Sequence, residues 1–400
     1  MAKIQVENLI KIFGNRPERA LQLLKEGVSK DEILKKTKNA VGIANVSFHV
    51  NEGEIFVVMG LSGSGKSTLI RCLNRLIDAT SGKILLDDED IVTMNKEELR
   101  EVRRSKLGMV FQKFALFPHK TVLENVEYGL EVKGSDAEAR KNKSIEALKL
   151  VGLDGWGESL PAHLSGGMQQ RVGLARALAI DPDILLMDEA FSALDPLIRK
   201  EMQDELLELQ NKMNKTIIFI THDLDEALKI GDRIALMKDG KIVQIGTPEQ
   251  ILKNPATEYV ARFVKDVDMS KVLSAKDVMI KPVILDDTKD GPRVALRKMQ
   301  IEEVSGIYIT DNKRKLKGYL SAEDVSLAVK NNQTNFEGLL QTDIPNVSPD
   351  TMLIDIFSLI AESKMPVAVV DDEGILKGII IRGPVLAALS RTEDELRDVE

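Results

Sequence analysis

The stretch GLSGSGKST, residues 60–68, decides the fold of this chain. It follows the strand-like run EIFVVM and precedes TLIRCLNRLI, whose apolar spacing predicts a helix. Glycines let backbone N–H groups wrap around phosphate oxygens, and the N-terminus of the helix adds a favourable dipole. In this context Lys66 would reach the β- and γ-phosphates of a nucleotide and Ser67 would bind Mg²⁺. The stretch therefore predicts an α/β domain with a nucleotide-binding phosphate loop.

A second motif, DILLMDEA at residues 183–190, supplies acidic groups for the same chemistry. Its apolar residues predict a buried parallel strand that ends in Asp188 and Glu189. An aspartate at the carboxyl end of such a strand is placed to hold Mg²⁺ through water. The glutamate beside it can orient and deprotonate an attacking water. Together the two motifs predict ATP hydrolysis with Mg²⁺ as the cofactor.

Composition excludes several other classes of protein. The 400 residues carry a net charge of −8 and a pI of about 5.4, whereas a nucleic-acid binder is normally basic, so we expect no nucleic-acid partner. The single cysteine, Cys72, excludes an internal disulfide framework and a cysteine-based zinc site. The N-terminus lacks a signal-peptide pattern, and the longest apolar runs are too short to span a membrane. We expect a cytosolic protein that reaches a membrane only through a partner.

The character of the sequence changes near residue 270, where an internal repeat begins. GIYITDNKRKLKGYLSAEDV at 306–325 is similar to VAVVDDEGILKGIIIRGPVL at 367–386, and Asp311 and Asp371 are 60 positions apart. Two copies at this period indicate a paired module, since a solenoid needs three or more. The expected divisions are an ATPase domain at 1–268, repeat copies at 273–331 and 333–391, and an acidic tail at 392–400.

The segment LSGGMQQRVGLARAL, residues 164–178, resembles the signature motif of ATP-binding cassette (ABC) ATPases. A Ser-Gly-Gly turn that opens a helix offers N–H donors to an anion. Other landmarks of that family follow in order along residues 1–265. The resemblance implies a P-loop ABC-type ATPase domain with a RecA-like core, an antiparallel β subdomain and a helical subdomain. It also implies a head-to-tail homodimer, in which the signature of one subunit contacts the ATP held by the other.

The same resemblance assigns further roles. Phe13 matches the aromatic residue that stacks on adenine, Gln112 matches the Q-loop glutamine, and His222 in FITHD matches the switch histidine. The expected ATP-binding residues are Phe13, Gly60, Ser62, Gly63, Ser64, Gly65, Lys66, Ser67 and Thr68. The expected Mg²⁺ ligands are Ser67, Gln112 and Asp188, and the expected catalytic residues are Gln112, Glu189 and His222. The signature residues are Leu164, Ser165, Gly166, Gly167 and Gln169, and Ser192 and Asp195 match the D-loop.

The repeat at about 273–390 resembles a tandem pair of CBS domains, an α+β module that often binds adenosine-type ligands. The first copy keeps, in GYLSAED, the Gly-x-x-Ser-x-x-Asp pattern associated with ribose or phosphate contact, through Ser321 and Asp324. The second copy reads GIIIRGP, with Arg382, and has lost both positions. The turn NKRKLKG would either touch an anionic membrane surface or form a solvated hairpin tip. Its basic residues are Lys313, Arg314, Lys315 and Lys317.

Over essentially its whole length the chain resembles the ATPase subunit of glycine betaine/proline importers, which take up quaternary-amine osmoprotectants. MGLSGSGKSTLIRCLNRLI and LLMDEAFSALDPLIRKEMQDEL are among the runs that carry this resemblance. It implies two copies of this chain and a membrane permease with an external substrate-binding domain, at the cytoplasmic face of the cell membrane. The CBS pair would regulate uptake through ionic strength, a cyclic dinucleotide or an adenosine-type ligand. The alternative is an importer of another amine or an amino acid, with the CBS pair as a dimerisation module.

An additional segment at about 15–41 interrupts the ATPase domain. RPERALQLLKEG predicts an amphipathic helix that ends at Gly27, and Ser29 with Glu32 forms a capping box for a second helix. A similar insertion marks the betaine-importer subfamily. A solvated surface decoration and a contact with the permease or its neighbour are both open as roles for this segment.

Overall fold

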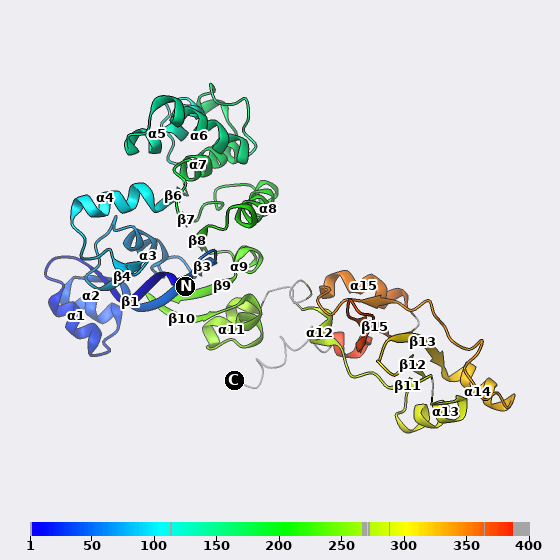
Figure 1. Ribbon diagram of the computed structural model, residues 1–400. Helices are drawn as coiled ribbons and strands as arrows, with labels where there is room; N and C mark the ends of the chain where they lie inside the picture. The colour runs from blue at the N-terminus through cyan, green and yellow to red at the C-terminus, as the bar shows by residue number, and fades with distance from the viewer. Residues whose placement is uncertain are drawn as a thin grey trace. The chain divides into compact units, whose positions relative to one another are not determined.

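The computed structural model describes residues 2–112, 114–265, 270, 273–287, 289–363 and 365–386 (Figure 1). The chain divides into two compact units, Met1–Asp266 and Val267–Glu400. The acidic tail expected at 392–400 lies outside the described residues. Within the described ranges, no helix has both the length and the apolar character needed to cross a bilayer.

A six-stranded sheet with the order β10-β9-β3-β8-β7-β6 forms the centre of the first unit. Its strands are β3 (Ile55–Met59), β6 (Leu107–Phe111), β7 (Ile184–Asp188), β8 (Thr216–Thr221), β9 (Arg233–Lys238) and β10 (Lys241–Gly246). Every residue of β3, β7 and β8 is buried, as the continuous apolar runs of a covered parallel sheet require. The strands from β9 to β6 are mutually parallel, so the carboxyl ends of β3, β8, β7 and β6 meet at one edge.

An antiparallel sheet with the order β2-β1-β4-β5 packs against this centre. Its strands are β1 (Ala2–Phe13), β2 (Ala40–Asn51), β4 (Ser81–Leu86) and β5 (Glu89–Asp90). Ile4 and Val46 from this sheet share one apolar core with Phe56 and Ile218 from the six-stranded sheet. Helix α3 (Lys66–Leu73) contributes Leu69, Ile70, Cys72 and Leu73 to the same core. The helix that follows the phosphate loop is therefore fixed by burial along one face.

Most of the other α-helices of the first unit fall into two sets. The first set consists of α4 (Lys96–Ser105), α8 (Pro196–Met213), α9 (Leu224–Ile230), α10 (Pro248–Lys253) and α11 (Glu258–Val264). The second set consists of α5 (Val122–Lys133), α6 (Ala137–Leu150) and α7 (Gly166–Ala179), which pack on one another and form a separate group in Figure 1. A short 3-10 helix, Pro161–His163, leads into α7.

Two short helices, α1 (Glu18–Lys25) and α2 (Lys30–Thr37), lie between β1 and β2. The chain turns between them at Gly27, whose φ is +84°. The Ser29 hydroxyl then caps α2 by accepting from the Glu32 N–H (3.4 Å). Ala20 and Ile33 are completely buried in a small core of their own with Ile10, Ile12, Val41 and Ala44. The insertion is thus anchored on the strands from which it projects.

The second unit contains two copies of one arrangement. The first copy consists of β11 (Ile284–Asp286), α13 (Pro292–Ile301), β12 (Gly306–Thr310), β13 (Leu316–Ser321) and α14 (Ala322–Lys330). The second consists of β14 (Asn346–Val347), α15 (Leu353–Glu362), β15 (Val367–Val370) and β16 (Leu376–Ile380). In each copy the first two strands are parallel and the last two antiparallel. The shared topology matches the internal repeat in the sequence.

The two copies exchange equivalent segments. Helix α12 (Ala275–Val278) opens the first copy in sequence, ahead of β11, but packs in the core of the second, against Leu353 and Ile356. The equivalent segment of the second copy, about sixty positions later, lies near Leu340 and packs in the core of the first copy. There Gln341 forms two backbone hydrogen bonds with Tyr319. Each copy therefore completes its core with chain that belongs, by the repeat, to the other.

Candidate active site

Seven of the expected site residues come together at the carboxyl edge of the six-stranded sheet. The phosphate loop follows β3, and the other residues follow or end β6, β7 and β8. These residues are Lys66, Ser67, Gln112, Asp188, Glu189, Ser192 and His222. Because neighbouring parallel strands end at the same edge, residues far apart in sequence become neighbours there.

The phosphate loop is held from outside by β2 and by the turn between β9 and β10. Gly65 has φ +107°, and a Cβ at this position would lie 2.6 Å from the carbonyl oxygen of Gly42. The Gly240 N–H donates to the carbonyl oxygen of Ser64 (2.8 Å). The close approach and the left-handed backbone both require glycine at position 65.

Lys66 is buried at the start of α3, and its ammonium points back into the loop. Nζ donates to the carbonyl oxygens of Gly60 (2.8 Å) and Leu61 (3.2 Å) and lies 3.9 Å from Glu189 Oε1. Burial lowers the pKa of Lys66, and the charge of Glu189 opposes that shift. The Ser64 Oγ is also buried and has no hydrogen-bond partner in the part of the chain that is described. A triphosphate in the loop would give the Ser64 hydroxyl a partner and would place negative charge beside the Lys66 ammonium, so these residues fit a nucleotide.

Ser67 and Asp188 form the site at which Mg²⁺ is expected. The Ser67 hydroxyl donates to Asp188 Oδ1 (3.1 Å), and Arg71 Nη2 lies 3.9 Å from Asp188 Oδ2. Burial raises the pKa of Asp188, and the hydrogen bond from Ser67 opposes the shift. A hydroxyl, a carboxylate and the side-chain oxygen of nearby Gln112 are the hard oxygen ligands that Mg²⁺ prefers, so the donor set fits this ion.

Glu189 is the residue on which the other side chains converge. Gln112 Nε2 donates to Glu189 Oε2 (3.1 Å) and to Ser192 Oγ (3.1 Å). His222 Nδ1 lies 3.6 Å from the same Glu189 oxygen, and the histidine side chain is 57% exposed. The Ser192 hydroxyl donates to the Glu189 carbonyl oxygen (2.9 Å), which fixes the turn after β7. The carboxylate is therefore oriented by the amide of Gln112, with the imidazole of His222 close by, at the open end of the sheet.

Phe13 ends β1 close to the phosphate loop. Its ring is 40% exposed, and the Lys11 ammonium lies 5.1 Å from the ring centroid. A Cβ at Gly42 would lie 2.7 Å from the Phe13 ring and 3.2 Å from the Thr68 methyl group. Phe13 is therefore close to the start of α3, as an adenine-stacking residue requires.

The signature residues lie in the turn before α7 and at the start of that helix. Ser165 caps α7, and its Oγ accepts from the Met168 N–H (3.3 Å). Gln169 Nε2 donates to the carbonyl oxygens of Pro161 and Leu164 (both 3.1 Å), which fixes the turn ahead of α7. These residues belong to the group formed by α5, α6 and α7, and not to the strand-edge cluster.

Asp195 caps α8, and its Oδ1 accepts from the Ile198 N–H (3.2 Å). A Cβ at Gly167 would lie 2.6 Å from Ile198 Cγ2, so the starts of α7 and α8 approach each other closely. The loop from Ser192 to Asp195 therefore runs from the strand-edge cluster to the start of α8, beside the signature helix of the same chain.

Three arginines near the site are not among the residues expected from the sequence. Arg71 follows Ser67 by one helical turn, so helical spacing alone would have found it. Arg176 on α7 donates to the carbonyl oxygens of Phe114 (3.0 Å) and Ala115 (2.6 Å), just after Gln112. Burial lowers the pKa of the Arg176 guanidinium. The third, Arg199, donates to the carbonyl oxygens of Ser192 and Leu194 and to Asp223 Oδ2, and only the fold brings these two loops together.

In the second unit, Ser321 and Asp324 form a helix cap. Ser321 Oγ donates to Asp324 Oδ2 (2.7 Å) and accepts from the Asp324 N–H (3.1 Å), and Gln341 Nε2 donates to the same carboxylate (3.2 Å). The basic residues Lys313, Arg314, Lys315 and Lys317 are exposed on the turn before or at the start of β13. The backbone of this turn pairs with the equivalent turn of the second copy, at Lys315 and Ile375.

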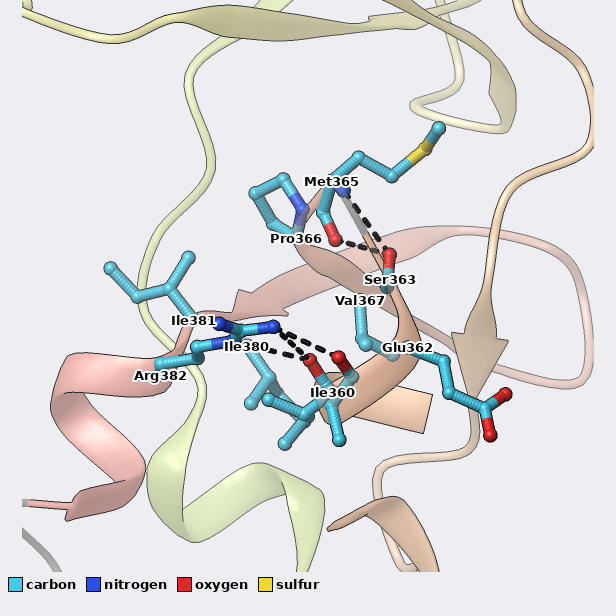
Figure 2. A pocket seen from close by; sticks show the side chains of 10 residues that line it. Ile360, Glu362, Ser363, Met365, Pro366, Val367, Ile380, Ile381 and Arg382 are labelled. Carbon is cyan, nitrogen blue, oxygen red and sulfur yellow. Dashed lines mark hydrogen bonds between the residues drawn. The ribbon is translucent and has the colours of Figure 1, made fainter. Parts of the chain in front are cut away.

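Arg382 lines a cavity of about 570 Å³ in the second copy. Figure 2 shows its guanidinium directed at the end of α15, where Nη2 donates to the carbonyl oxygens of Ile360 (3.3 Å) and Ala361 (2.9 Å). Ser363 and Met365 close the neighbouring turn through two mutual hydrogen bonds. The cavity thus lies in the copy that lacks the Ser-x-x-Asp pattern.

Comparison with known proteins agrees with this geometry. A family model described as ABC transporter matches residues 43–192, and one described as CBS domain matches 275–331 and 337–389. The glycine betaine/carnitine transport ATP-binding protein GbuA of Listeria monocytogenes is 58% identical over 98% of this chain and 99% of its own length. The chain belongs to the ATP-binding subunits of ABC transporters.

Other members of this ABC family extend the likeness. The glycine betaine transport ATP-binding protein OpuAA of Bacillus subtilis is 57% identical over 97% of this chain and 92% of its own length. The dimeric structure of the ATP-binding cassette MJ0796 bound to ADP and Pi is 33% identical, with a TM-score of 0.52, over 61% of this chain and 98% of that one. The expected fold class, an ABC-type ATPase domain followed by a tandem CBS pair, is confirmed.

Membership of the ABC family also settles the coarse biochemistry. ATP hydrolysis in this subunit is coupled to transport by a membrane partner, and ABC cassettes work as dimers. The resemblance to glycine betaine transporters drawn from the sequence is likewise confirmed by the names of the relatives.

Proposed function

We propose that this chain hydrolyses ATP to power uptake of glycine betaine or a related quaternary amine through a separate permease. The arrangement of Glu189 with Lys66, Asp188, Gln112 and His222 at one sheet edge carries the enzymatic part of the proposal. The glycine betaine transport proteins named above, at 58% and 57% identity, support the substrate class.

In this proposal the residues at 60–68 bind the phosphates and Phe13 stacks on the adenine. Lys66, already directed into the loop by two carbonyl oxygens, would exchange them for phosphate oxygens. Ser67, Gln112 and Asp188 would hold Mg²⁺, which when bound neutralises phosphate charge and polarises the γ-phosphate.

Glu189 would act as the general base. Its carboxylate would accept a proton from the attacking water while Gln112 keeps that carboxylate oriented. His222, 3.6 Å from the same carboxylate, would donate to the γ-phosphate from the opposite side. General-base catalysis of this kind contributes on the order of 10²- to 10⁴-fold to a rate.

The complete site would need a second copy of the chain. The signature residues 164–169 start α7, where free backbone N–H groups attract an anion, and in a head-to-tail dimer they would meet the γ-phosphate of the partner. Ser192 and Asp195 would lie at the same junction. The dimeric MJ0796 cassette supports this arrangement.

The proposal places this chain at the cytoplasmic face of the membrane, with a permease that carries an external substrate-binding domain. The ATPase domain would comprise 1–268, with the insertion at about 15–41, and the CBS copies 273–331 and 333–391. The 15–41 segment would then be either a surface decoration or a contact with the permease.

The CBS pair would regulate transport by responding to ionic strength, a cyclic dinucleotide or an adenosine-type ligand. Ser321, Asp324 and Arg382, with the basic turn at 313–317, are the residues that would take part, and the cavity beside Arg382 offers room for a ligand. If the CBS pair is only a dimerisation module, truncation near residue 270 should leave the salt dependence of transport unchanged.

Uptake by the reconstituted transporter tests the function. Vesicles that contain the complex and internal ATP should accumulate labelled glycine betaine, and vesicles with Glu189→Gln should not. Internal salt should be varied, and unlabelled choline, carnitine and proline should be added as competitors. No accumulation of labelled glycine betaine in vesicles that do hydrolyse ATP would overturn the substrate assignment.

A further inference from the structure

Arg199 contacts both of the loops that follow β7 and β8. It lies in the first turn of α8, and its side chain is 26% exposed. Nη2 donates to the carbonyl oxygens of Leu194 (3.1 Å) and Ser192 (3.4 Å), and Nη1 donates to Asp223 Oδ2 (3.4 Å). One guanidinium therefore joins the loop at 192–195 to the residue that directly follows His222.

Both of these loops lie against Glu189, one at its backbone carbonyl and the other at its carboxylate. The Ser192 hydroxyl donates to the Glu189 carbonyl oxygen (2.9 Å) and accepts from Gln112 (3.1 Å). His222 lies 3.6 Å from the Glu189 carboxylate. One loop therefore contacts the backbone of Glu189 and the other lies beside its carboxylate.

The far partner of Arg199 is itself rigidly placed. Asp223 caps α9, with Oδ1 accepting from the Glu226 N–H (3.2 Å) and its own N–H donating to Thr221 Oγ1 (3.0 Å). One turn beyond Arg199, Gln203 Nε2 donates to the buried Glu226 carboxylate (3.1 Å). Two consecutive contacts thus connect α8 to the first turn of α9.

We infer that Arg199 is a positioning residue for ATP hydrolysis, which ties the 192–195 loop and the His222 loop to one fixed spacing around Glu189. This inference rests on the proposed ATPase function. A planar guanidinium can donate in several fixed directions at once, whereas the single ammonium of lysine cannot span the loop carbonyls and Asp223 together. Displacement of a catalytic group by about 1 Å can cost on the order of 100-fold in rate.

Steady-state ATP hydrolysis by the full chain in complex with its permease tests the inference. The variants are Arg199→Met, Arg199→Lys, Asp223→Asn and the double variant Arg199→Met with Asp223→Asn. Lys229→Met is the matched control, because Lys229 Nζ bonds Asp204 Oδ1 (2.7 Å) and joins the same two helices but neither loop. Glu189→Gln is measured alongside.

Arg199→Met should lower kcat about 10- to 100-fold while the KM for ATP stays within about three-fold. Arg199→Lys should recover part of the loss. Because the two residues act through one contact, the double variant should be no slower than Arg199→Met. Lys229→Met should keep kcat within about two-fold of wild type, even if loss of its ion pair lowers the stability of the chain.

A kcat for Arg199→Met within two-fold of wild type, or a fall shared equally by Lys229→Met, would overturn the inference. The inference would also be overturned if the fold-loss in kcat of the double variant equalled the product of the losses in the two single variants. If Arg199→Met does not fold, Arg199→Lys and Asp223→Asn carry the test. Normal turnover in Glu189→Gln would instead overturn the proposed function itself, so the two failures are distinguishable.

Discussion

At the scale of single residues, backbone conformation at the site is as specific as side-chain chemistry. Glu189 has φ +47°, a left-handed conformation that a non-glycine residue keeps only where its surroundings hold it. Its N–H donates to the Ile220 carbonyl oxygen of β8 (3.1 Å), and its own carbonyl accepts from Ser192. This bend ends β7 and turns the carboxylate toward Gln112 and His222.

Gly65→Ala tests the backbone requirement of the phosphate loop. The new Cβ would lie 2.6 Å from the Gly42 carbonyl oxygen in a left-handed conformation, so the loop must shift. We expect ATP affinity to fall more than about ten-fold, measured by equilibrium titration, since a shifted loop misaligns several phosphate contacts. Gly27→Ala is the control, because Gly27 is also left-handed but has open space around its Cβ position. Equal affinities in the two variants would contradict this account.

At the scale of elements, the helical insertion is attached by burial on one face only. Ile33 on α2 is completely buried, whereas its neighbour Leu34 is 46% exposed. The small core beneath α1 and α2 includes Ile10 and Ile12 of β1, the strand that ends in Phe13. Loosening this core would therefore also loosen the end of β1.

Ile33→Ala and Leu34→Ala form a matched pair on α2. Removal of the buried Ile33 side chain should lower the free energy of unfolding by about 2–4 kcal/mol. Removal of the half-exposed Leu34 side chain should cost less than about 1 kcal/mol, because it loses little buried area. Urea denaturation of the purified chain measures both values. Similar losses from the two substitutions would show that the assigned faces of α2 are wrong.

The first turn of α9 predicts a pH dependence of stability. Burial raises the pKa of Glu226, and its hydrogen bonds from Thr221 and Gln203 oppose the shift. The folded state therefore binds the Glu226 proton more tightly than the unfolded chain does. Protonation of Glu226 thus stabilises the fold at low pH, and this contribution to the free energy of unfolding is lost as the pH rises through the raised pKa.

Glu226→Gln, which cannot ionise, should gain stability relative to wild type as the pH rises from about 4.5 to 8. Denaturation midpoints across this pH range measure the difference. Glu208→Gln, at an exposed position of α8, is the control and should show no such trend. A difference between Glu226→Gln and wild type that is independent of pH would contradict the predicted titration.

At the scale of the whole molecule, the exchange between the two CBS copies makes them interdependent. Leu273, Ala275 and Val278 lie at the start of the first copy in sequence, ahead of β11, but are buried in the core of the second. A chain that ends at residue 331 would expose these apolar side chains, whereas a chain that ends near residue 270 would remove both copies together.

We therefore expect chain 1–270 to be soluble and to retain ATP binding within about three-fold of the full chain, since the first unit has its own core. Chain 1–331 should aggregate or bind a hydrophobic dye strongly. Size-exclusion chromatography and dye fluorescence of the two truncations measure this difference. A monomeric, well-folded chain 1–331 would show that the copies are independent.

The sequence predicts those parts of the molecule whose signals are local. Lys66 and Ser67 lie in a contiguous motif, and Asp188 and Glu189 end a continuous apolar run, so their chemistry can be inferred before the fold is known. Gln112 and His222 are isolated polar residues whose roles came only from family resemblance.

The remaining features depend on tertiary contacts. Arg199 and Asp223 are 24 positions apart and meet only because β7 and β8 are neighbours. Ser321 and Asp324 fit a ligand pattern in sequence, and the same spacing also suits the helix cap that they form. The exchange of α12 between the CBS copies is likewise a tertiary contact, because its apolar side chains do not indicate by themselves which core they join.

That exchange bears on how such a protein can change over generations. A tandem duplication is usually free to lose one half, because the surviving half is already complete. Here each half keeps part of its interior in the other, as α12 against Leu353 and Gln341 against Tyr319 show. A gene that lost one copy would encode an unstable remnant. The pair should therefore be gained, lost or transferred as a single heritable piece.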